Sequence, residues 1–163
     1  MTLRIRHASQ ADAGACAAIY APFVRDTAIS FELEPPSTKE MARRIGEYGT
    51  SHGWLVAEVG GQVAGYAYGS PHAVRAAYAR SCDVGLYIDP AFARRGLGRA
   101  LYEQLLPALA ARGYHVALAR IALPHPASEG LHEAMGFTLA GVFREVGWKF
   151  DRWHDVGWWQ RLL

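Results

Sequence analysis

Hydrophobic and polar residues along this chain follow two periods: the alternation typical of strands, and the spacing of about three to four residues typical of helices. Residues 3–7 alternate and predict an edge-like strand. Ser9 and Asp12 follow, and an acid at the third helical position is a variant of the capping box, so a helix should begin here. The apolar face expected for this helix consists of Ala15, Ala18, Ile19 and Phe23.

The middle of the chain predicts a second helix and a hairpin. Pro35-Pro36 breaks the chain, and Ser37 can cap the helix that follows. The apolar positions of that helix are Met41, Ile45 and Tyr48. Residues 54–59 and 62–69 predict strands, and the Gly60-Gly61 pair between them is a two-residue hairpin signal.

The second half of the chain alternates between strand and helix patterns. It predicts a strand at 83–88, a helix at 98–112 with a kink at Pro107, a strand at 115–121, a short helix at 127–135 and a closing hairpin at 138–160. The resulting order, β-α-α-β-β-β-α-β-α-β-β, predicts a single mixed α/β domain over residues 1–163. Its central sheet should be partly antiparallel.

Composition narrows the class of protein. The chain has 163 residues, of which 51% are hydrophobic, which suffices for one domain with a real core. The net charge is only +2 and no basic stripe is visible, which argues against nucleic acid as a partner. No apolar run approaches the roughly 20 residues of a membrane span, and the first residues lack the apolar core of a signal peptide. We therefore expect a cytoplasmic protein with no membrane partner.

Cysteine and histidine positions give no sign of a disulfide or a metal. The two cysteines, Cys16 and Cys82, show neither a pairing pattern nor metal-ligand spacing, so we expect two buried thiols. His52, His115 and His154 also lack ligand spacing. The sequence therefore predicts no metal site.

One segment has the character of an anion site. Residues 86–101, LYIDPAFARRGLGRAL, combine an apolar strand with a glycine-punctuated basic loop that enters a helix. The first amides of a helix lack intrahelical partners, and Gly96 and Gly98 let a phosphate approach them closely. The lysine of a P-loop is missing, and Leu101 stands where a dinucleotide loop has its third glycine. We expect a different phosphate-bearing ligand; the alternative is a tight turn without a ligand.

The same residues resemble a known family. The run RRGLGRAL at 94–101, opening a helix after the fourth predicted strand, resembles the GNAT acetyltransferase superfamily. Four further segments are similar to its phosphinothricin and methionine sulfoximine N-acetyltransferase branch. They are DTAISFE at 26–32, Ala77-Tyr78, LHEAMGF at 131–137 and, most specifically, FREVGWKFDRWHD at 143–155.

The resemblance implies a GNAT fold, with a twisted mixed sheet of about six to seven strands flanked by about four helices. It also implies acetyl-CoA as co-substrate. The cofactor-binding residues it implies are Leu86, Tyr87 and Ile88 through their amides, Arg94, Arg95, Gly96, Leu97, Gly98 and Arg99 in the loop, and His125 and Ser128 at the following helix. Ala93 and His125 depart from the family pattern, which has Gln or Arg and Asn at these places.

The resemblance also implies the catalytic and acceptor-binding residues. Asp83 stands where the branch carries a catalytic glutamate and is the candidate base; the alternative is an exposed acid at a strand end. His132 stands where many members of the superfamily carry a tyrosine near the leaving sulfur, and it is the candidate acid for the leaving thiolate; the alternative is a histidine that only packs. The residues expected to bind the acceptor are Phe31, Arg75, as a carboxylate fork, and Tyr78.

We therefore expect an acetyl-CoA-dependent N-acetyltransferase. Its acceptor would be the amine of a small amino-acid-like compound such as phosphinothricin, methionine sulfoximine or methionine sulfone, acetylated directly in a ternary complex. The alternatives are another amine (a protein N-terminus, a polyamine or an aminoglycoside) and a non-catalytic acetyl-CoA-binding module. Large aromatics on the last strands favour a homodimer. These are Trp148, Trp153, Trp158 and Trp159, which we assign to core or dimer contacts rather than to ligand stacking.

Overall fold

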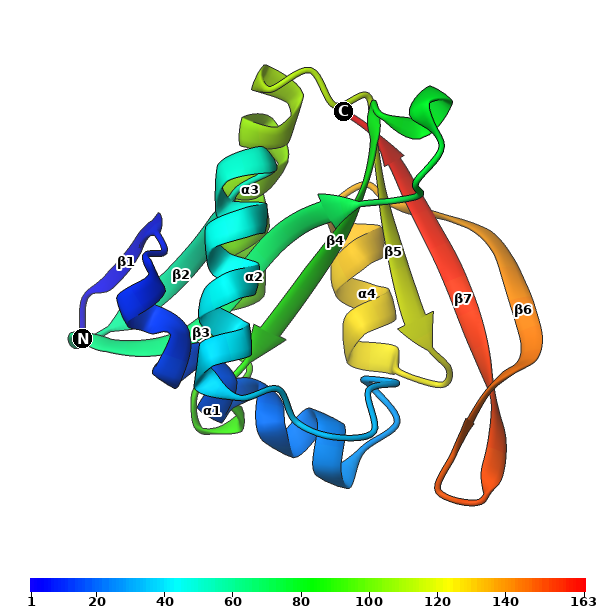
Figure 1. The fold of residues 1–163 in the computed structure, drawn as a ribbon, viewed down its shortest axis with the longest axis horizontal. Helices are drawn as coiled ribbons and strands as arrows, with labels where there is room; N and C mark the ends of the chain where they lie inside the picture. Colours follow the sequence, from blue (N-terminus) through cyan, green and yellow to red (C-terminus); the bar gives the residue numbers. More distant parts are fainter.

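The computed structural model describes residues 1–163, which form one seven-stranded sheet in the order β1-β2-β3-β4-β5-β7-β6 (Figure 1). The strands are β1 (Leu3–His7), β2 (Trp54–Val59), β3 (Gln62–Pro71), β4 (Ser81–Ile88), β5 (Val116–Ala122), β6 (Thr138–Lys149) and β7 (Arg152–Leu162). The helices are α1 (Ala13–Asp26), α2 (Thr38–Ser51), α3 (Leu97–Ala111) and α4 (Pro126–Ala134). The predicted order of elements and the mixed sheet are confirmed.

The parallel pair β4–β5 is the point where the sheet opens. All other neighbouring strands are antiparallel, whereas β4 and β5 run in the same direction and pair only from Ser81 to Asp83 against Val116 to Leu118. Beyond these residues the two strands diverge, as Figure 1 shows. The edge of β4 from Val84 to Ile88 therefore faces β5 without pairing to it.

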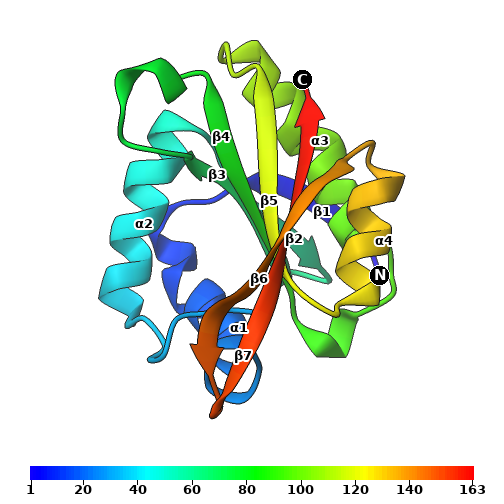
Figure 2. The same ribbon diagram turned by 90° about the vertical axis from the view of Figure 1, so that its right-hand side faces the viewer.

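Each face of the sheet has its own core. Helix α3 packs on one face over a cluster that includes Leu101, Leu105 and Cys82, and α1 and α2 pack on the other over Val56 and Tyr66. Figure 2 shows α1 and α2 on one side of the sheet and α3 and α4 on the other. Successive residues of a strand point to opposite faces, so Asp83 faces away from the Cys82 side.

The buried face of α1 differs from the prediction. The buried residues are Ala13, Cys16, Ala17, Ile19, Tyr20 and Val24, while Ala18 is exposed and Ala15 is half-buried. The chain first makes a 3-10 turn over Gln10–Asp12, in which the Ser9 amide donates to Asp12, and α1 begins after it. Because the helix begins after this turn, the side of α1 that faces the sheet carries Cys16 and Tyr20.

The other predicted helices and strands form close to their predicted bounds. Ser37 caps α2 by accepting a hydrogen bond from the Glu40 amide at 3.1 Å. Helix α3 continues through Pro107, whose side chain is exposed, to Ala111. Cys16 and Cys82 are buried free thiols, and burial raises the pKa of each to about 12. None of the helices is long and apolar enough to cross a bilayer.

Candidate active site

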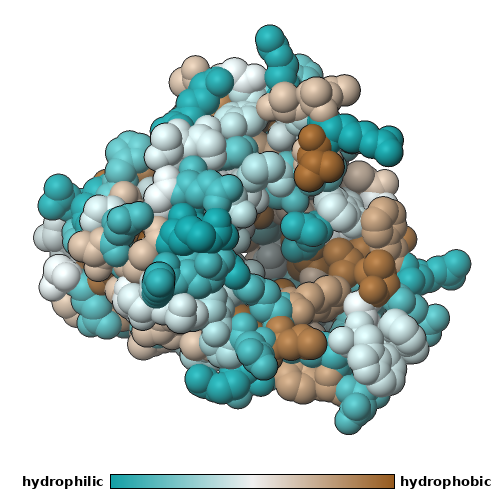
Figure 3. Space-filling view, viewed as in Figure 1, coloured by the Kyte–Doolittle hydropathy of each residue, from teal (hydrophilic) through white to brown (hydrophobic).

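A cleft of about 540 Å³ lies where β4 and β5 diverge. Its walls come from both strands, from α4, from the segment between α1 and α2, and from the β6–β7 hairpin. The space-filling view shows the surface hollowed near the middle of this face, with apolar residues along one side of the hollow (Figure 3). A small polar molecule and the end of an elongated donor fit such a space.

Asp83 is the buried carboxylate of this cleft. Only 6% of the residue is exposed, so the alternative of an exposed strand-end acid is excluded. Its Oδ1 lies 2.7 Å from His72 Nδ1, and its Oδ2 lies 3.1 Å from the guanidinium of Arg120. Burial raises the pKa of Asp83, and the hydrogen bond from His72 acts in the opposite direction. A carboxylate with a raised pKa is suited to accept a proton near neutral pH.

The partners of Asp83 were missed in the sequence because strand pairing brings them there. Ser70 pairs with Asp83 across β3 and β4, so His72, two residues further on, lies beside the carboxylate. Arg120 lies on β5 between the buried Ala119 and Ile121 and therefore faces the cleft. Alternation on β5 was a usable signal for Arg120, whereas nothing local marked His72.

His132 lies in the cleft wall with both ring nitrogens engaged. Its Nδ1 lies 2.7 Å from the Ser128 carbonyl, to which it donates, so Nε2, at 2.9 Å, accepts from the Tyr102 hydroxyl. Burial lowers the pKa of His132, which keeps the ring neutral at neutral pH. Neither ring nitrogen is free to donate into the cleft, and the hydroxyl proton of Tyr102, a cleft residue that the sequence analysis did not single out, is donated to His132.

The loop before α3 has the chemistry of an anion site. The amides of residues 94–99 donate no hydrogen bond within the protein; the first helical bond runs from the Ala100 amide to Gly96. Gly96 has φ +77°, which favours glycine, and a Cβ on Gly98 would lie 3.0 Å from Leu131. Six free amides at a helix start, with the side chain of Arg94 unpaired beside them, fit the pyrophosphate of acetyl-CoA.

The other predicted cofactor residues lie along the same channel. The side chains of Leu86 and Ile88 pack on the α3 core and Tyr87 packs on the α1 core, which leaves their backbone as the part that faces the gap. His125 caps α4, its Nδ1 accepting from the Ser128 amide at 3.4 Å, and both residues line the cleft. The structure thus brings the predicted donor-binding residues together.

The acceptor end differs from the prediction at two residues. Phe31 lines the cleft as expected, but Arg75 and Tyr78 lie outside it. A 3-10 turn at Ala76–Tyr78 between β3 and β4 leaves both side chains exposed. Tyr78 reaches the site only through His72, whose ring centre is 5.6 Å from its own.

The four tryptophans divide between three places. Trp159 is buried in the core, as expected. Trp148 and Trp153 are each 55% exposed and contact one another. Trp158, contrary to the prediction, lines the cleft beside Arg120, because it pairs with that residue across β5 and β7.

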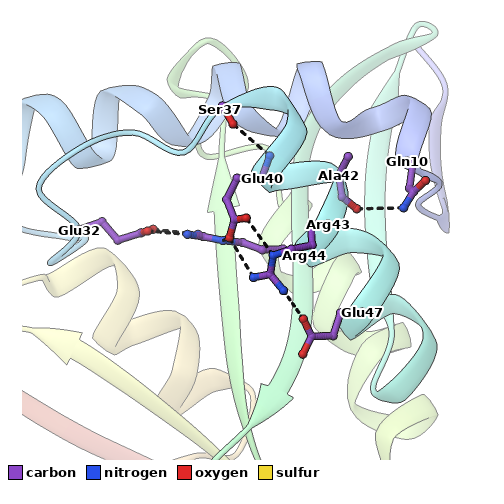
Figure 4. Close-up of polar contacts among 8 residues, drawn as sticks. All are labelled: Gln10, Glu32, Ser37, Glu40, Ala42, Arg43, Arg44 and Glu47. Atoms are coloured by element: carbon purple, nitrogen blue, oxygen red, sulfur yellow. Dashed lines mark hydrogen bonds and ion pairs between the residues drawn. The ribbon is translucent and has the colours of Figure 1, made fainter.

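The segment that carries Phe31 is held by a polar network. Arg44 of α2 donates to both carboxylate oxygens of Glu32, at 2.7 and 3.0 Å, and Glu40 joins the same arginine, as Figure 4 shows. Tyr20 donates to Glu32 at 2.5 Å. These contacts, above all the hydrogen bonds from Arg44, lower the pKa of Glu32, so its charge is present and already paired.

A buried lysine fastens the same segment to the hairpin. Lys149 is only 5% exposed, and its ammonium donates to the carbonyls of Val24, Ser30 and Glu32 at 2.6, 2.7 and 2.9 Å. Burial lowers the pKa of this lysine. The contacts order the chain on both sides of Phe31.

No group of three His, Cys, Asp or Glu side chains is arranged to hold a metal ion.

A split mixed sheet with free amides at one end of the gap and a buried carboxylate in the cleft defines a transferase with a phosphate-bearing donor. The sequence model of the acetyltransferase (GNAT) domain matches residues 5–158. A phosphinothricin N-acetyltransferase of Streptomyces viridochromogenes is 38% identical over 159 residues, which cover 98% of this chain and 87% of that protein. An L-methionine sulfoximine/L-methionine sulfone acetyltransferase of Salmonella typhimurium is 32% identical, and the match covers 99% of this chain and 95% of that protein.

A solved structure agrees with these relatives. A phosphinothricin acetyltransferase of the GNAT superfamily from Sinorhizobium meliloti, in complex with acetyl-CoA, superposes with a TM-score of 0.95 at 35% identity, covering 100% of this chain and 89% of that one. The chain therefore belongs to the GNAT acetyltransferase family, in the branch of these relatives. It is an N-acetyltransferase that uses acetyl-CoA.

Proposed function

We propose that this enzyme acetylates the amine of a small amino-acid-like acceptor, with phosphinothricin, methionine sulfoximine and methionine sulfone as first candidates. The observation that carries the proposal is the buried carboxylate of Asp83 in a compact cleft, beside a single arginine. The named activities of the similar proteins give the acceptor class. A cleft of about 540 Å³ suits one amino acid together with the end of the donor.

The chemistry assigned to the chain's residues is proton transfer and orientation. Bound acetyl-CoA supplies an acetyl thioester. Asp83 accepts a proton from the acceptor's ammonium group, and the free amine then attacks the thioester carbon directly. As the amide forms, its nitrogen releases a second proton and the leaving thiolate takes one up through solvent, because the single hydroxyl proton of Tyr102 is already donated to His132. Neither Cys16 nor Cys82 serves as nucleophile, because both thiols are buried with pKa values raised to about 12.

Binding of the donor is assigned to the backbone. The free amides of residues 94–99 hold the pyrophosphate, and the unpaired edge of β4 at residues 86–88 holds the pantetheine arm and thioester oxygen. Arg94, Arg95 and Arg99 add positive charge, and His125 and Ser128 border the arm from α4. We also propose that residues 1–163 act as one domain and that the enzyme is a homodimer.

An assay of acetyl-CoA consumption, followed as released thiol, tests the acceptor class. The panel holds phosphinothricin, methionine sulfoximine, methionine sulfone, the common amino acids, polyamines, an aminoglycoside and a short peptide with a free N-terminus. We expect turnover on the amino-acid analogues and its loss in Asp83→Ala. Turnover on polyamines or peptides alone would replace the acceptor, and acetyl-CoA binding without any turnover would favour a non-catalytic module.

A further inference from the structure

One arginine faces the cleft, and it is not the one that the sequence suggested. Arg120 is the only lysine or arginine among the residues that line the cleft, whereas Arg75 is exposed outside it. We propose that Arg120 binds the carboxylate of the acceptor and thereby selects amino acids over simple amines. This inference rests on the proposed function and names the residue that confers its specificity.

The fold fixes Arg120 in this place. Its neighbours Ala119 and Ile121 are buried on the α3 side of β5, so its side chain projects into the cleft. Trp158, its partner across β5 and β7, lies under the guanidinium, whose carbon is 5.4 Å from the ring centre. Stacking of this kind restrains an arginine while leaving its N–H groups free.

The donors of Arg120 are available to a ligand. The side chain is 60% exposed, and its one polar contact is the ion pair of 3.1 Å with Asp83 Oδ2. The exposed face of a guanidinium can donate two parallel hydrogen bonds to a carboxylate. The cleft therefore contains a guanidinium with N–H groups available to a ligand, directly beside the carboxylate that is to accept the proton.

The pairing of Asp83 with Arg120 matches the charge pattern of an α-amino acid. Such an acceptor carries an ammonium and a carboxylate on one carbon, so the ammonium can meet Asp83 while the carboxylate meets Arg120. Binding then exchanges one ion pair of the protein for two with the ligand. A polyamine has no carboxylate and would place a further cation beside Arg120, which disfavours it.

Kinetics of Arg120→Met and Arg120→Lys test the proposal. Each variant is assayed with methionine sulfone and with the corresponding amine that lacks the carboxylate. We expect Arg120→Met to raise the KM for methionine sulfone by about 10- to 100-fold, the effect of losing a charge-assisted pair, with a smaller change in kcat. Its KM for the amine should stay the same or fall, and Arg120→Lys should recover part of the loss. Arg4→Met, which changes an exposed arginine on the edge strand β1, is the matched control and should behave as wild type.

Three results would overturn the proposal. In the first, Arg120→Met keeps the wild-type preference for the amino acid; the role of Arg120 is then refuted, while the proposed function still stands. In the second, Arg120→Met lowers turnover of both acceptors equally, which shows that Arg120 acts through Asp83. In the third, wild type binds acetyl-CoA in calorimetry but acetylates no amino acid, and the proposed function then fails as well. Thermal melts and acetyl-CoA affinity establish folding, and Arg120→Lys carries the test if Arg120→Met does not fold.

Discussion

At the scale of single residues, the groups around Asp83 set the pKa of the carboxylate that is to act as the base in acetyl transfer. The carboxylate must be ionised to take a proton from the acceptor, and burial raises its pKa above the ordinary value. His72 and Arg120 oppose this shift by stabilising the charged form. The site thus makes Asp83 a stronger base than an ordinary aspartate, while His72 and Arg120 favour its charged form.

We expect kcat/KM to fall as the pH falls through the raised pKa of Asp83, because protonation removes the base. The acid limb should lie at higher pH than for an ordinary aspartate. Asp83→Asn should lower kcat by about 10²- to 10⁴-fold and abolish the limb. Asp26→Asn, which changes an exposed acid, is the control. An acid limb that survives in Asp83→Asn would assign the base to another group.

Residue-scale chemistry was predictable where the motif was local. Asp83 was singled out by the resemblance to the branch, which carries a glutamate at this place, and the anion loop follows from glycines and arginines within six residues. His72 and Arg120 reach Asp83 only through the register of β3, β4 and β5, which the sequence pattern does not give. Arg75 lies outside the cleft because a turn carries it outward, and its position along the chain, next to the fourth strand, does not reveal that turn.

At the scale of elements, the loop before α3 depends on small residues. A larger side chain at Gly98 would meet Leu131 and Leu86 and move the free amides. We expect Gly98→Val to raise the KM for acetyl-CoA by about 10- to 100-fold, since small displacements of a binding group are costly. The KM for the acceptor should change far less. Gly14→Ala, at an open position on α1, is the control, and an unchanged KM for acetyl-CoA in Gly98→Val would contradict the assignment.

The segment between α1 and α2 depends on Lys149. Removing the ammonium leaves three carbonyls without their donor and frees the chain around Phe31. We expect Lys149→Met to lower the free energy of unfolding by about 2–3 kcal/mol and to raise the KM of the acceptor more than that of acetyl-CoA. Lys39→Met, at the chain's other lysine, which is exposed, is the matched control. Denaturant unfolding and steady-state kinetics measure both effects.

At the scale of the whole molecule, the β6–β7 hairpin presents an apolar surface. Between residues 143 and 153, five large apolar side chains are more than half exposed: Phe143, Val146, Trp148, Phe150 and Trp153. Two of them, Phe143 and Val146, also border the cleft. A surface of this kind marks an interaction site in a protein of this size. A second copy on this hairpin would cover the aromatics and adjoin the acceptor end of the cleft.

We therefore expect wild type to be a dimer in solution and Trp148→Glu with Trp153→Glu to shift it to monomer, because charges oppose burial of this surface. Light scattering after size-exclusion chromatography measures the mass. Val74→Glu, which places the same charge at a fully exposed position far along the chain, should remain dimeric. A monomeric wild-type protein at micromolar concentration would contradict the dimer.

The central claim, that this chain transfers acetyl from acetyl-CoA to the amine of an amino acid with Asp83 as base, is tested most directly by the product. Wild type and Asp83→Asn are incubated with acetyl-CoA and L-methionine sulfone, and the mixture is analysed by tandem mass spectrometry. We predict one acetyl group on the α-nitrogen of methionine sulfone with wild type, and little or none with the variant. No acetylated methionine sulfone with wild type, or equal amounts with both proteins, would contradict the account.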